Sequence, residues 1–151
     1  MKATHYSPSL QLTCLPPTGE QVDAQEMKVW EGKLWGAGQT IRGMIKDLIH
    51  NPDDPELWFD LGGVFGDKAE MALTYYYTAH RIAPCRPKYI DMIARVLLRA
   101  GDADGAVKFM DDALGNFDQG TDEYALVQCY KEDIILRSRI RLIRSRLGID
   151  W

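Results

Sequence analysis

The sequence has few of the residues from which catalytic and metal centres are usually built. Its 151 residues include only three cysteines and three histidines. Cys14, Cys85 and Cys129 are too few and too widely spaced for a disulfide framework, and the histidines lack metal-ligand spacing. The glycines at 36 and 38 are not followed by the Gly-Lys-Ser/Thr of a phosphate-binding loop. These absences predict a protein that is not an enzyme, with no catalytic residues, metal or other cofactor.

Cys85 and Cys129 are the remaining candidates for a reactive group. Cys85 lies between Pro84 and Arg86, and a neighbouring cation would lower the pKa of its thiol. Cys129 together with a distant histidine would form a nucleophile pair. The alternative for both cysteines, a buried or half-buried structural thiol, is the interpretation favoured here.

Long hydrophobic runs are also missing. No apolar stretch approaches the roughly 18 residues that a membrane-spanning helix needs. The first residues, MKATHYSPSLQLTCLPP, are interrupted by Ser, Thr and Pro, and do not form the apolar core of a signal peptide. Together with the scarcity of cysteine, this pattern predicts a cytoplasmic protein.

Positive charge is concentrated near the C-terminus. The formal net charge is -4, which disfavours a general nucleic-acid binder. Residues 131–151 nevertheless hold six Lys or Arg against three Asp or Glu. The sequence therefore predicts an acidic body with a basic tail.

Helical periodicity dominates the part of the chain that follows residue 19. Apolar residues recur at spacings of three and four, as in amphipathic helices, over 57–65, 69–82, 90–98 and 107–114. Helices are also expected at 21–31, 34–49 and 122–147, the last of them with a bend or break midway. Asp54-Pro55 is typical of a helix start, and Thr121 or Asp122 of another. No convincing strand pattern is present, so an all-α fold is predicted.

Two segments of the sequence can be aligned with each other. PELWFDLGGVFGDKAEMALTYYYTAHRIAP begins at Pro55, and PKYIDMIARVLLRAGDADGAVKFMDDALGNF begins at Pro87. The matched pairs are Trp58 and Ile90, Leu61 and Ile93, Gly62 and Ala94, Phe65 and Leu97, Ala72 and Ala106, Tyr76 and Met110, and Ala79 and Ala113. The small residues are expected where two helices cross closely, with the bulky residues between them.

The first segment resembles the tetratricopeptide repeat (TPR) family. The family pattern is W-x2-L-G-x2-Y, followed by A-x3-F, A and P. The corresponding residues are Trp58, Leu61, Gly62, Phe65, Ala72, Tyr76, Ala79 and Pro84. The turn of this copy is two residues shorter than the pattern, and the second copy replaces the aromatic residues with aliphatic ones.

The resemblance implies antiparallel helix pairs stacked as a short TPR-like solenoid. The clearer repeats cover 55–84 and 87–117, a divergent repeat covers 20–52, and 121–151 forms the capping helix that solenoids need. One helical domain at 20–151 would thus follow an irregular N-terminal arm at 1–19. An unrelated α-helical bundle is the alternative.

The family resemblance also implies that the first helix of each pair lines a concave surface. In the second copy, Lys88, Met92, Arg95 and Arg99 are spaced by four, three and four residues and share one side of the helix. In the first copy, the matching face includes Phe59 and Asp60. This arrangement suits an acidic or amphipathic peptide. We therefore expect an adaptor or chaperone that binds a protein or peptide partner, the alternative for these faces being solvated helix surface.

The basic tail offers a second candidate surface. Its apolar stripe consists of Leu136, Ile140, Ile143 and Leu147. Its cations are Arg137, Arg139, Arg141, Arg144 and Arg146. A capping helix would bury this stripe against the last repeat and direct its arginines towards acidic residues of the body, which is the interpretation favoured here. A regulatory arm would instead bind nucleic acid or an anionic membrane, although both are less expected partners than a protein. The sequence is compatible with a homo-oligomer.

Overall fold

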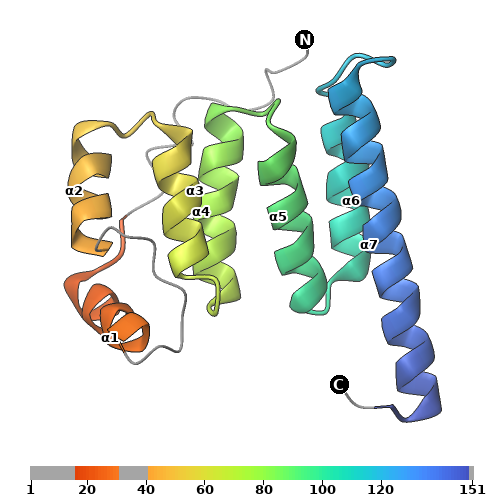
Figure 1. Cartoon of the computed structure of the whole chain (residues 1–151), viewed down its shortest axis with the longest axis horizontal. Helices are drawn as coiled ribbons and strands as arrows, with labels where there is room; N and C mark the ends of the chain where they lie inside the picture. Colours follow the sequence, from red (N-terminus) through yellow and green to blue (C-terminus); the bar gives the residue numbers. More distant parts are fainter. Residues whose placement is uncertain (1–15, 31–40, 150–151) are drawn as a thin grey trace. The chain divides into compact units, whose positions relative to one another are not determined.

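The computed structural model describes residues 16–30 and 41–149 (Figure 1). These residues form seven α-helices and no strand, which confirms the all-α prediction for the described part of the chain. The helices are α1 (Gly19–Trp30), α2 (Ile41–His50), α3 (Pro55–Val64), α4 (Ala69–Ile82), α5 (Pro87–Arg99), α6 (Ala103–Leu114) and α7 (Asp122–Leu147). Within these ranges, no helix is both long and apolar enough to cross a membrane.

Parts of four predicted elements lie outside the described residues. They are residues 1–15 of the arm, residue 31 of the first helix, residues 34–40 of the second helix and residues 150–151 of the capping segment. Residues 16–18 have no regular secondary structure, and α1 begins at Gly19, two residues before its predicted start.

The described residues divide after Pro84 into two compact units. The N-terminal unit contains α1 to α4, and the C-terminal unit contains α5 to α7. Consecutive helices pack against each other within each unit, with α3 and α4 antiparallel in one and α5 and α6 antiparallel in the other (Figure 1). The division falls at the proline that the sequence predicts as the end of a repeat.

Small residues allow α3 and α4 to approach closely. A Cβ atom added to Gly62 would lie 2.6 Å from Cε1 of Tyr76, so the aromatic ring of α4 rests directly on the α3 backbone. Ala72 and Ala79 of α4 have no exposed surface. The predicted role of Gly62 at a close helix crossing is therefore confirmed, and it explains why α3 tolerates a residue that weakens isolated helices.

Several helices begin at the residues that the sequence indicates. The Asp54 side chain accepts a hydrogen bond from the backbone N–H of Glu56 at 3.0 Å, and Pro55 occupies the first turn of α3. At the start of α7, the Thr121 hydroxyl accepts a hydrogen bond from the backbone N–H of Tyr124 at 3.3 Å. Both contacts satisfy backbone donors that a helix start leaves without partners.

A buried glutamine attaches α1 to the turn between α3 and α4. Gln25 Nε2 donates to the carbonyl oxygen of Val64 at 2.8 Å and to Asp67 Oδ1 at 2.7 Å. Lys28 forms an ion pair with the same carboxylate. Burial alone would raise the pKa of Asp67, but the hydrogen bonds from Lys28 and Gln25 outweigh it and hold that pKa below its usual value.

The core of the C-terminal unit lies where the first half of α7 packs on α5 and α6. Its buried members are Ile90, Ala94, Leu98, Ala106, Met110, Ala113, Leu114, Val127 and Ile134. Helix α7 contributes only Val127 and Ile134 to this set. It is one unbroken helix of 26 residues, so the predicted break is absent. At 1.5 Å per residue it is about 39 Å long, twice the length of the 13-residue α5.

The predicted burial of the apolar stripe on α7 is wrong. The exposed fractions are 56% for Leu136, 38% for Ile140, 53% for Ile143 and 67% for Leu147. The physical reason is the position of the stripe around the helix axis. Ile143 follows the buried Ile134 by nine residues, or about two and a half turns, so it lies on the opposite side of α7.

Substitution of the two adjacent glycines of α3 should test the close crossing. Gly62→Ala should lower the free energy of unfolding by about 1 to 3 kcal/mol, because its methyl group would overlap the Tyr76 ring. Gly63→Ala is the matched control, since its Cβ would lie 3.8 Å from the Tyr76 hydroxyl oxygen. That variant should gain up to about 1 kcal/mol from helix propensity. Urea denaturation measures both changes, and equal effects would contradict this packing.

Acidification should destabilise the protein through His80 of α4. Burial, with a smaller effect of Arg81, lowers the pKa of His80 from 6.5 to about 4. Between these values the unfolded chain binds a proton that the folded chain does not, so stability falls as the pH decreases. The loss should approach about 3 kcal/mol at pH 4. Urea denaturation at pH values between 7 and 4 measures this loss of stability. His80→Gln should remove the part of the pH dependence that His80 causes. A pH dependence of stability that is the same in this variant as in the wild type would refute the role of His80.

Candidate functional site

An open groove lies between α5 and α7 in the C-terminal unit. Its volume is about 660 Å³, within the range of known ligand sites. Helix α5 contributes Met92, Arg95, Leu98 and Arg99 to its lining. Helix α7 contributes Asp133, Leu136, Arg137, Ile140, Arg141 and Arg144. We call this feature the α5–α7 groove.

The groove joins two surfaces that the sequence presents as separate candidates. Three of the four residues on the predicted α5 face line it, and so do three of the five tail arginines. Lys88 is exposed and lies outside the lining, as do Arg139 and Arg146. Phe59 and Asp60 belong to α3 of the N-terminal unit, where the Phe59 ring lies 5.2 Å from that of Tyr76 between centroids.

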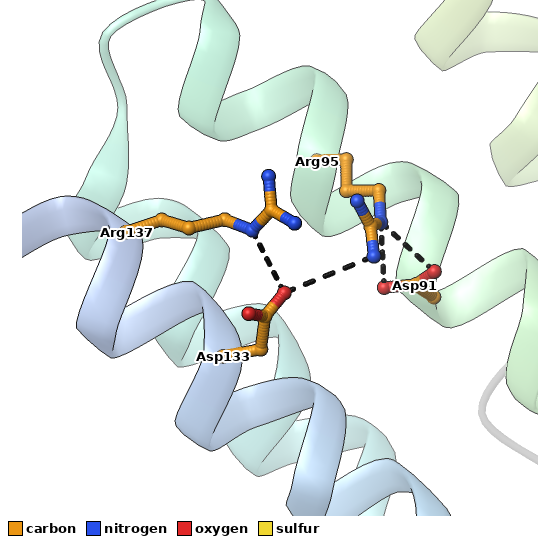
Figure 2. Close-up of polar contacts among 4 residues, drawn as sticks. All are labelled: Asp91, Arg95, Asp133 and Arg137. Atoms are coloured by element: carbon orange, nitrogen blue, oxygen red, sulfur yellow. Dashed lines mark hydrogen bonds and ion pairs between the residues drawn. The ribbon is translucent and has the colours of Figure 1, made fainter.

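Four charged side chains of alternating sign connect the two helices across the groove (Figure 2). Arg95 Nε donates to both carboxylate oxygens of Asp91, at 3.0 and 2.9 Å. Asp133 Oδ2 accepts from Arg137 Nε at 2.8 Å and lies 3.8 Å from Arg95 Nη2. Because these groups are partly exposed, each pair contributes at most about 1 kcal/mol. Their main effect is to fix the directions of two guanidinium groups.

Arg141 has a different role, at the point where α5 ends. Its Nη1 donates to the carbonyl oxygen of Leu98 at 2.6 Å. The same carbonyl oxygen also accepts from the backbone N–H of Gly101 at 3.1 Å. Because the C-terminal end of a helix carries partial negative charge, a cation there stabilises the helix end. Arg99 forms no hydrogen bond or ion pair with any residue in the described ranges. Its side chain is exposed within these ranges and lines the groove.

The groove combines excess positive charge with apolar surface. Five arginines line it, whereas Asp133 is the one carboxylate of the described residues in the lining, with Asp91 beside Arg95. The apolar part consists of Met92, Leu98, Leu136 and Ile140. Arginine stays protonated and pairs with carboxylates through two parallel hydrogen bonds. Such a lining can bind a ligand that carries both carboxylate and apolar groups.

The surroundings of Cys85 do not activate its thiol. Burial, with a smaller contribution from Asp118, raises the pKa of Cys85 above its ordinary value. The suggestion that Arg86 lowers this pKa is therefore wrong. The Sγ atom instead lies 3.6 Å from the carbonyl oxygen of Asn116, to which it donates a weak hydrogen bond. Cys129 is exposed, so the expected buried or half-buried position is wrong for this residue. No cluster of potential metal ligands occurs among the described residues.

The sequence pattern misses two lining residues, Leu98 and Asp133, and it assigns Leu136 and Ile140 to the stripe of the tail without relating them to α5. Spacing along one helix shows which of its residues share a side, but it does not pair α5 with α7. One usable signal is the seven-residue interval from Val127 to Ile134 and then to Arg141. It marks the core-facing side of α7 and the position where that side becomes charged.

Comparison with known proteins gives no relative from which a site could be transferred. No protein-family model matches the chain. No curated protein matches it either. The α5–α7 groove is therefore identified from its geometry and charge alone.

Removal of the Arg141 guanidinium should weaken the end of α5. Arg141→Met keeps most of the aliphatic side chain but removes the hydrogen bond to Leu98, and should cost about 1 kcal/mol. Arg139→Met is the matched control, because Arg139 is exposed and lies outside the groove. It should change stability by less than about 0.5 kcal/mol. Thermal denaturation compares the two variants, and an equal loss in both would contradict the proposed cap.

Proposed function

We propose that this protein is a non-catalytic interaction module that binds an acidic segment of another protein in the α5–α7 groove, as an adaptor or chaperone. The observation that carries the proposal is that five arginines and four apolar side chains line the same groove. Acidic side chains of a bound segment would pair with the arginines, and its apolar side chains would cover Met92 and Leu136. At a partly exposed surface each such pair is worth at most about 1 kcal/mol, so recognition would combine several pairs with burial of apolar side chains.

A TPR-like arrangement of the helices is part of the proposal. Two antiparallel pairs, α3 with α4 and α5 with α6, support it, as does the contact between Gly62 and Tyr76. The first half of α7 packs on both α5 and α6. This is the position that the first helix of a following repeat, or a capping helix, would take. In such an arrangement a groove beside α5 and α7 would belong to the concave surface.

Arg99 provides the most direct test of the groove. The probe is a fluorescein-labelled peptide of about 20 residues composed of Glu and Leu, with binding followed by anisotropy. Arg99→Glu should weaken binding about tenfold or more, because it replaces a cation that has no partner in the described chain with an anion. Lys108→Glu is the matched control, since it makes the same charge change at an exposed position of α6. Equal weakening by both variants would move the binding site away from the groove.

A second candidate function is regulation through nucleic acid or an anionic membrane. The exposed apolar stripe of α7, with arginines on both sides, is the observation that favours it. Binding to phosphates falls steeply with salt because counterions are released. Titration with single-stranded DNA and with phosphatidylserine vesicles, at about 50 and 200 mM salt, separates the candidates. Tighter binding to either probe than to the acidic peptide would favour this second function.

A further inference from the structure

The C-terminal half of α7 carries an exposed apolar stripe with the spacing of a coiled coil. Leu136, Ile140, Ile143 and Leu147 follow one another at intervals of four, three and four residues. These are alternating d and a positions of a heptad repeat. Three of the four side chains are more than half exposed. We call these four residues the α7 seam.

Arginines occupy every position that flanks this seam. In the same heptad register, Arg137 and Arg144 are e positions, and Arg139 and Arg146 are g positions. Side chains at e and g determine which helix can pair with a coiled-coil seam. The α7 seam is therefore bordered by positive charge on both sides.

We propose that the α7 seam is a docking surface for an acidic amphipathic helix of another protein, which lies along α7 and places its own acidic e and g residues against the four arginines. The proposal rests on the binding function proposed above and specifies the conformation of the bound segment. The seam extends about 17 Å, or three helical turns. A partner helix would insert its apolar side chains between Leu136, Ile140, Ile143 and Leu147.

A second copy of the chain is a poor occupant of this surface. In a parallel pair each g position lies opposite an e position of the other helix, and in an antiparallel pair e faces e and g faces g. The e and g positions within the seam are all arginine. An antiparallel pair of copies therefore places arginine opposite arginine, which is repulsive. A parallel pair does the same at Arg139 and Arg144, although it also places Glu132, the g position before the seam, opposite Arg137. Acidic side chains at the same positions convert each of these contacts into an attractive one.

The α5–α7 groove favours a protein helix over a membrane surface. Leu136 and Ile140 belong to both the seam and the groove lining. Asp133, held by Arg137, lies beside them. An anionic bilayer would face this carboxylate and could not fill a recess of about 660 Å³, whereas side chains of a helix can enter it. The guanidinium of Arg99, which has no partner among residues 16–30 and 41–149, would meet an acidic residue of the same helix.

The test uses two labelled peptides of identical composition with the full-length protein. The first has Leu at a and d and Glu at e and g over three heptads, and the second is a scrambled version that has no apolar face. The first peptide should bind about tenfold or more tightly than the second. It should also gain helicity on binding, measured by circular dichroism. Equal affinity for the two peptides, with Arg99→Glu still weakening both, would overturn the helix proposal and leave the groove function intact.

Variants on the seam and its flank identify the surface. Ile143→Ala with Leu147→Ala should weaken binding of the first peptide about tenfold, without a change in melting temperature, because both side chains are exposed. Arg139→Glu with Arg146→Glu should reduce the preference for the peptide with Glu at e and g over one with Lys there about tenfold, because Arg137 and Arg144 keep their charge. Arg139→Lys with Arg146→Lys is the control that keeps the charge, and should retain the original preference. Unchanged preference in the Glu variant would overturn the proposal.

Three further outcomes would also overturn it. Failure of both peptides to bind would refute the groove function together with the seam. A dimer in sedimentation experiments that disappears with Ile143→Ala would identify a second copy as the occupant. Binding to phosphatidylserine vesicles that depends on Ile143 and Leu147, with peptide binding independent of them, would identify a membrane.

Discussion

The difference in length between α7 and the helices beneath it determines the properties of the C-terminal unit. Helix α7 has 26 residues, whereas α5 has 13 and α6 has 12. The core can therefore cover only the first half of α7, and Ile134 is its last buried residue. One heptad later, Arg141 takes the core-facing position and caps the end of α5 through Leu98. After Arg141, the core-facing side of α7 has no helix of the C-terminal unit to contact, so folding does not require apolar side chains there.

The apolar side chains in the second half of α7 nevertheless keep a regular helical spacing. They lie on the side opposite Ile134, where they do not contribute to the core. Exposed apolar surface bordered by charge is a common sign of an interaction site. Three ion pairs, which join Asp91 to Arg95, Arg95 to Asp133 and Asp133 to Arg137, orient the charged side chains of the adjoining groove (Figure 2). Rigid placement of the arginines lowers the entropic cost of binding an acidic partner.

Local rules predicted much of the fold. The helix starts at Asp54 and Thr121 follow from capping chemistry, and Gly62 follows from the need for a close crossing. The orientation of α7 could not be predicted in the same way. Periodicity shows that Leu136 and Ile143 share a side of the helix, but not whether that side meets the core. The groove and the contact of Gln25 with Val64 were likewise beyond prediction, because both join segments that are distant in the sequence.

The central claim is that the last part of α7 serves binding and is not needed for folding. Removal of residues 142–151 tests it most directly, because this truncation keeps the core and Arg141 but deletes half of the α7 seam. The account predicts a soluble protein that unfolds cooperatively, with a melting temperature within a few degrees of the intact chain, and that binds the acidic helical peptide at least about tenfold more weakly. A truncated protein that aggregates or unfolds would instead show that this segment stabilises the fold as a cap, and would contradict the account.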